Sequence, residues 1–264
     1  MSLDLDDLTL DWPCTAGEIC ARLVPGRDGA SFVQLRVELG VLQMHLDGRP
    51  DGGRCHGLPT SQDHITHELR VGRSLAPADW KELDRELAQF NYRRLAFTSL
   101  AEDAMRANDR AAAATHLVRA LTDIQACLRA IELAEQHRPR PSADHALRPI
   151  LVFNRARLLS QWHVVEGLYD EGVEAAETGA RELRDLLLGA GHEPEHVEQD
   201  AGVTFLEQLS ARLRKQYGLA QTLRERFEQA IENEDFETAA QLREELRRRE
   251  EKSRLQLPPP GDSA

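Results

Sequence analysis

The 264-residue sequence has no long apolar run and no closely paired cysteines. No stretch approaches the roughly 20 apolar residues of a membrane-spanning helix, and the first residues are acidic where a secretory signal needs a basic start. The cysteines Cys14, Cys20, Cys55 and Cys127 lack CxxC spacing. We therefore expect a cytoplasmic protein with reduced thiols and no membrane segment.

The sequence also lacks the common catalytic motifs. It has no Gly-x-Ser-x-Gly elbow, no Walker phosphate loop and no dinucleotide-binding glycine motif after a strand. Basic residues are outnumbered, with 33 Lys+Arg against 45 Asp+Glu and a formal net charge of −12. This balance repels a phosphate backbone. We expect neither direct nucleic-acid binding nor a bound cofactor, and a protein that is not an enzyme.

Residues 31–46 alternate apolar and polar side chains, which is typical of half-buried strands. Turn-forming sequences at 25–29 and 48–53 flank this stretch, and residues 19–24 precede it. A small β-rich domain with about three antiparallel strands is predicted for residues 1–72, and Gly40 is expected to mark a bulge or a close backbone approach. The residues expected on one side of the strand are Val33, Leu35, Val37 and Leu39.

The pattern becomes helical near Leu75, where Pro77 suits a first helical turn. Residues 92–128 and 150–187 each read as two helices separated by a short break, within a helical domain at 73–190. The later pair resembles a tetratricopeptide-type hairpin, and a plain helical bundle explains the same pattern. The positions that carry this resemblance are Gly167, Leu168, Tyr169, Ala175 and Ala176.

Apolar residues recur at spacings of three and four from Leu206 to Ala230. This spacing predicts one long helix with a coiled-coil seam, followed by a helical hairpin, within a segment at 203–252. The proline-rich tail at 253–264 is predicted to be disordered. The fold class is therefore α+β and mostly α.

The most specific pattern lies between Leu223 and Leu246. Asn233 is expected to be a left-handed C-terminal cap, and Asp235 to cap a second helix. The apolar stripe of the first helix is Leu223, Phe227, Ala230 and Ile231. The residues expected to face it from the second helix are Phe236, Ala239, Ala240 and Leu246.

These residues resemble the UVR (UvrB/UvrC) motif, a helical hairpin found in bacterial excinuclease subunits and in adaptors of proteases and kinases. Glu244 replaces the usual Asp, and the matching positions are Ala230, residues 233–237, Ala239, Ala240, Leu242 and Arg243. The resemblance implies a hairpin that docks on a protein partner, either another UVR protein or a second copy. The residues assigned to this docking are Leu223, Phe227, Ala230, Ile231, Asp235, Phe236, Ala239, Ala240, Leu242, Arg243 and Leu246.

A hairpin this short needs support from another surface. The alternative to docking is that it closes an intramolecular coiled coil on residues 206–213. Arg36, Gln43 and Arg49 form a second candidate surface for a ligand or partner, although ordinary turn and surface roles explain them more simply.

Two groups of residues have the composition of zinc sites. His192 and His196 match the HExxH pattern, but Pro194 is expected to start a helix that leaves His192 outside. Four further residues are expected to lie in loops without a metal. They are Cys55, His56, His64 and His67.

Three functions are consistent with the sequence. The first is a non-enzymatic scaffold or adaptor that docks a protein through the hairpin. The second is an accessory factor in nucleotide-excision repair or another nucleoprotein complex. The third, a cryptic zinc enzyme, would use His192 and His196.

Overall fold

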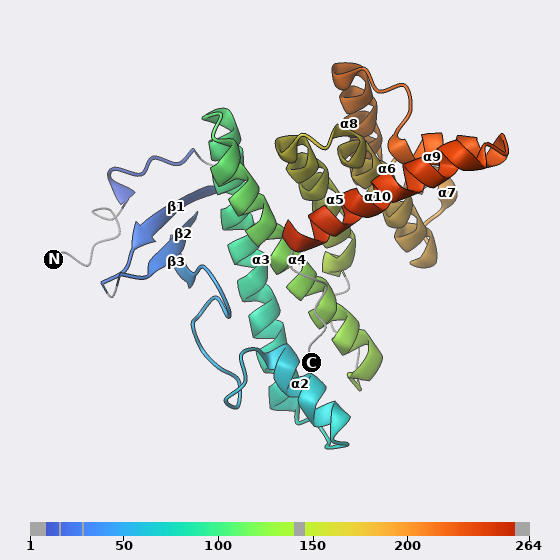
Figure 1. The fold of residues 1–264 in the computed structure, drawn as a ribbon. Coiled ribbons are helices and arrows are strands. Elements are labelled where there is room, and N and C mark those ends of the chain that lie inside the picture. The colour runs from blue at the N-terminus through green and yellow to red at the C-terminus, as the bar shows by residue number, and fades with distance from the viewer. Residues whose placement is uncertain (1–8, 16, 28, 140–145, 257–264) are drawn as a thin grey trace. The chain divides into compact units, whose positions relative to one another are not determined.

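The computed structural model describes residues 9–15, 17–27, 29–139 and 146–256 of the chain. The chain divides into two compact units, Met1–His145 and Ala146–Ala264. The described residues are mostly helical, with one small antiparallel sheet near the N-terminus, which confirms the predicted fold class (Figure 1). Within these ranges, no helix is long and apolar enough to cross a membrane.

The sheet of the first unit has the strand order β1-β2-β3. Its strands are β1 (Cys20–Pro25), β2 (Ser31–Val37) and β3 (Gly40–His45), close to the predicted segments. Val33 and Leu35 of β2 are buried, and the sheet packs against α3.

The predicted alternation fails at the turn between β2 and β3. Leu39 is 94% exposed because it lies in the two-residue connection and not on the buried side of a strand. Gly40 does not form the predicted bulge, since it begins β3 directly opposite Val37.

Three helices complete the first unit as described: α2 (Ser61–Arg70), α3 (Pro77–Arg106) and α4 (Arg110–His137). Helix α3 begins at Pro77 as predicted, and α3 packs along α4 as a helical hairpin. Helix α2 was not predicted. Its N-terminus is fixed by the Thr60 side chain, which accepts a hydrogen bond from the Asp63 backbone N–H.

A buried ion pair ties the sheet to this helical hairpin. The Arg93 guanidinium donates two hydrogen bonds to the Asp123 carboxylate, at 2.9 and 2.7 Å. It also donates to the backbone carbonyls of His45 and Gly48, at 2.8 and 2.9 Å. Burial raises the pKa of Asp123 to about 6, against the lowering effect of Arg93. Arg93 therefore holds the end of β3 on α3 and α4.

The second unit consists of helices. A bundle is formed by α5 (Leu147–Glu166), α6 (Tyr169–Gly189) and α8 (Ala201–Tyr217), with α6 packed on both partners. The remaining helices are α7 (Pro194–Glu198), α9 (Leu223–Glu232) and α10 (Phe236–Gln256). The boundary between the units falls inside the 73–190 segment, so the structure groups α3 and α4 with the sheet and not with α5 and α6.

The predicted single long helix with a coiled-coil seam is wrong, because two helices replace it. Helix α8 ends at Tyr217, where Gly218 takes a left-handed conformation, and α9 starts at Leu223. Helix α10 extends the helical part of the chain through Gln256, whereas the rest of the predicted tail, residues 257–264, lies outside the described residues.

Helices α5 and α6 cross at close range. Gly179 of α6 faces Ala156 of α5, and a Cβ added at Gly179 would overlap the Ala156 Cβ. Ser160 also donates a hydrogen bond of 2.7 Å to the Gly172 carbonyl across the same pair of helices.

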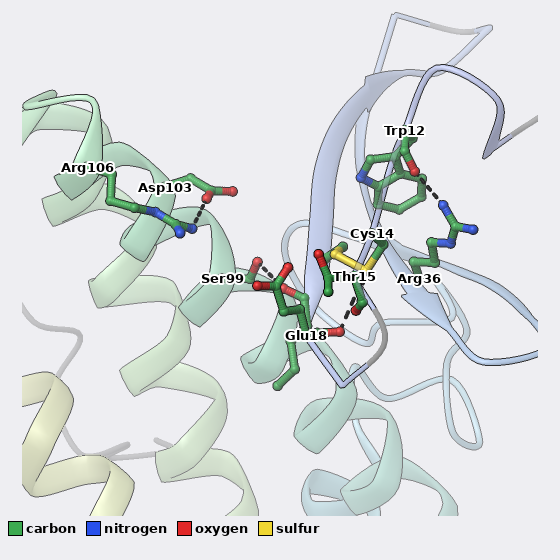
Figure 2. Close-up of a disulfide and its surroundings, with 10 residues drawn as sticks. Trp12, Cys14, Thr15, Glu18, Arg36, Ser99, Asp103 and Arg106 are labelled. Atoms are coloured by element: carbon green, nitrogen blue, oxygen red, sulfur yellow. Dashed lines mark hydrogen bonds and ion pairs between the residues drawn. A yellow bond between two sulfur atoms is a disulfide. The ribbon is translucent and has the colours of Figure 1, made fainter.

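The cysteines differ from the prediction. Cys14 and Cys20 form a disulfide, with their Cα atoms 5.9 Å apart, so the prediction of reduced thiols is wrong for this pair. Figure 2 shows the bond joining the segment before the sheet to β1. Nearby, Ser99 of α3 donates a hydrogen bond of 2.7 Å to the Ile19 carbonyl. Cys55 and Cys127 remain thiols and are buried.

Candidate functional site

The hairpin α9–α10 is defined by local signals at both ends of α9. Thr222 caps α9 in a reciprocal capping box with Glu225. Asp235 caps α10 by accepting a hydrogen bond of 3.1 Å from the Thr238 N–H, as predicted. The left-handed residue of the connection is Glu234, with φ of 56°, and not Asn233.

The two helices of the hairpin bury a small apolar core between them. Phe227 and Leu246 are half-buried against this core. Because Ala239 faces inward, α10 can pack closely on α9. The buried members of the core are Leu223, Ala230, Ala239 and Leu242.

Several residues of the motif point away from this core. Phe236 is 67% exposed and Ile231 is 45% exposed, on either side of the connecting turn. The prediction that Phe236 and Ala240 face α9 is therefore wrong, since both are exposed. Phe236, Ala240 and Arg243 are spaced i, i+4 and i+7, so they share one face of α10. We call these three residues together with Ile231 the outer face of the hairpin.

Ion pairs attach the hairpin to the bundle. Arg224 of α9 lies 3.4 Å from Glu174 of α6, and Arg249 of α10 lies 3.0 Å from Glu171 of α6. Arg214 of α8 bridges Glu177 and Glu225, at 3.0 and 2.7 Å. The alternative in which the hairpin closes on Leu206, Leu209 and Leu213 does not hold, because these leucines pack in the core of the bundle.

A groove of about 990 Å³ lies between the hairpin and the bundle. Burial raises the pKa of its lining residue Glu174, against the lowering effect of hydrogen bonds from Thr222 and Arg224. A hydrogen bond from Arg214 lowers the pKa of Glu225. The Glu225 shift therefore follows from a contact that attaches the hairpin, whereas the Glu174 shift follows from burial.

The arginines of this region are engaged by glutamates. Arg184 pairs with Glu198, at 3.1 Å, and Arg247 pairs with Glu244, at 2.6 Å. These ion pairs offset the positive charge that binding a phosphate group would need. The geometry therefore favours arginines that hold protein segments together over arginines that bind phosphate.

The residues of the second predicted surface do not come together as a binding site. Arg36 donates to the Trp12 carbonyl, and Gln43 accepts a hydrogen bond of 2.9 Å from Gln34. Arg49 is buried and forms ion pairs with Asp51 and Glu82, at 2.9 and 2.6 Å. Arg49 thus serves the interior of the first unit.

The HExxH pattern does not form the helix that a zinc protease requires. Pro194 begins the short helix α7, and His192 lies before it, as predicted. The two histidines therefore do not lie one turn apart on a continuous helix.

Searches of family models, of curated proteins and of solved structures each find no match to this chain. The resemblance to the UVR motif consequently rests on residues 223–246 alone.

Proposed function

We propose that this protein is a non-enzymatic adaptor that docks a partner through the outer face of its α9–α10 hairpin. The observation that carries the proposal is the exposure of Phe236, which shares one face of α10 with Ala240 and Arg243. The hairpin's own core is already closed, so docking requires no opening of the hairpin. An exposed aromatic beside a small residue suits a closely packed helical partner.

The partner we propose is a helical hairpin of the same type, in a second copy of this chain or in another UVR protein. Charges of both signs alternate along α10, where Arg247 pairs with Glu244 and with Glu251. A face with mixed charges and an apolar tip complements another copy of itself, whereas a face of one sign would repel it. The resemblance to the UVR motif supports the same partner.

The test compares the full-length chain with Phe236→Glu and Ala240→Glu by sedimentation velocity over a range of concentrations. We expect both substitutions to abolish self-association, because they place charge on the docking face. Leu39→Glu is the matched control, since Leu39 is an exposed apolar residue of the β2–β3 turn. Phe227→Glu is less informative because it disrupts the core of the hairpin.

A monomeric native chain would exclude the second copy. Affinity capture would then decide, with the native chain and Phe236→Glu side by side. Loss of a UVR-bearing partner only from the variant supports docking, and an excinuclease subunit would place the protein in DNA repair. An unchanged set of partners would refute the docking face.

A further inference from the structure

Three potential metal ligands converge in the first unit from separate segments. His56 lies in the turn before α2, His64 lies on α2, and Asp79 lies in the first turn of α3. The Asp79 Oδ1 atom is 3.4 Å from the His64 Nε2 atom and 3.7 Å from the His56 Nε2 atom. The three ligand atoms lie within 4.8 Å of one another. Of the zinc candidates considered from the sequence, Cys55 and His67 are not members of this group, and Asp79 takes their place.

The backbone at His56 is strained. Cys55 and Leu58 exchange two backbone hydrogen bonds, of 2.9 and 2.8 Å, across a two-residue turn. Both residues inside the turn are left-handed, with φ of 48° at His56 and 83° at Gly57. Turns of this kind favour Asn or Gly, and a side chain such as His costs about 1–2 kcal/mol. The turn therefore presents an imidazole at a position where Asn would be more stable.

Backbone contacts orient the other two ligands. The Asp79 Oδ2 atom accepts a hydrogen bond of 2.7 Å from the Ala76 N–H, which leaves Oδ1 facing the two histidines. His64 is buried on α2, whose start is fixed by Thr60. Outer contacts of this kind hold metal ligands in place in known sites. Contrary to the sequence-based expectation, His64 is helical and does not lie in a loop.

We propose that His56, His64 and Asp79 bind one divalent transition-metal ion. Two imidazole nitrogens and one carboxylate oxygen form the donor set of zinc and non-haem iron sites that keep an open coordination position. With metal–ligand bonds of about 2.0–2.2 Å, tetrahedral ligands lie about 3.4 Å apart, close to both separations from Asp79. The His56 side chain is 65% exposed, so its imidazole can move closer to the other two ligand atoms when a metal binds.

The competing arrangement is a metal-free cluster in which the two imidazoles stack and share the carboxylate. The rings stack with centroids 4.2 Å apart at an interplanar angle of 26°. A metal titration distinguishes the two arrangements, because only the metal-binding arrangement saturates at one ion per chain.

The experiment titrates Zn²⁺ into the metal-free, full-length protein by calorimetry. Native protein is expected to bind one equivalent, and His56→Asn and Asp79→Asn to lose about 100-fold or more in affinity. Asn suits the left-handed turn at position 56, and at position 79 its side-chain oxygen can still accept from the Ala76 N–H, so both variants should stay folded. The control is His67→Asn, on the same helix and outside the group.

Cobalt gives an independent readout, because visible absorption of bound Co²⁺ reports its coordination and should disappear in His56→Asn. Absence of saturable binding, or equal binding by native protein and His56→Asn, would overturn the proposal. Loss of binding in His196→Asn instead would move the metal to the second unit.

Discussion

At the scale of single residues, His163 couples stability to pH. Its Nδ1 atom is buried without a hydrogen-bond partner among the described residues, and burial lowers its pKa from 6.5 to about 4. Between these values the unfolded chain binds a proton that the folded chain does not. The contribution of His163 to the free energy of unfolding of the second unit should therefore fall as the pH drops from 6.5 to 4, by up to about 3 kcal/mol.

Urea denaturation at pH 7 and at pH 4.5 measures this loss. His163→Gln should show a smaller loss than the native chain, because its side chain does not titrate. The control His192→Gln, at an exposed position, should behave like the native chain. An unchanged pH dependence in His163→Gln would contradict the assignment.

At the scale of elements, the α5–α6 crossing depends on the absence of a side chain at Gly179. Gly179→Ala should destabilise the second unit by about 1–3 kcal/mol, because the new methyl group overlaps Ala156. Gly189→Ala, at the end of the same helix, meets no neighbouring atom within 4 Å and should be neutral or slightly stabilising. Thermal unfolding of both variants checks this, and equal melting temperatures would show that the crossing adapts.

Most elements could be predicted from periodicity and capping residues. The strands and the start of α3 at Pro77 follow from alternation and from proline chemistry. The alternation of apolar and polar residues, however, continues through Leu39, which lies in the turn. Residue spacing alone therefore does not reveal where a strand turns. Likewise, the leucines of α8 and the start of α9 share a spacing of three to four, although the left-handed Gly218 and the Thr222 cap separate the two helices.

The sites were less predictable because they depend on tertiary contacts. Ala239 and Ala240 are adjacent and chemically identical, yet one is buried and the other exposed. The attachment of Arg224 to Glu174 spans 50 residues, and Asp79 of α3 joins His64 of α2 and His56 of the turn before α2. A single sequence carries no signal for such pairings.

At the scale of the whole molecule, the Cys14–Cys20 disulfide is evidence about the cellular compartment of the protein. Cytoplasmic localisation was predicted from the acidic first residues, the lack of a long apolar run and the expected reduced thiols, whereas disulfides persist mainly in oxidising compartments. Because Cys14 and Cys20 are bonded, a thiol assay of the denatured, unreduced protein should detect two thiols, those of Cys55 and Cys127. Prior reduction is the control and should release all four. Four thiols without reduction would instead support the cytoplasmic prediction.

The way the hairpin is attached also affects its motion. Partly exposed ion pairs such as Arg224–Glu174 are weakened by salt, which screens the attraction between their charges. The α5–α6–α8 bundle has an apolar core that salt does not weaken. We therefore expect the hairpin to open separately from the bundle, so that its backbone amides exchange with deuterium sooner than those of the bundle, and sooner still at higher ionic strength.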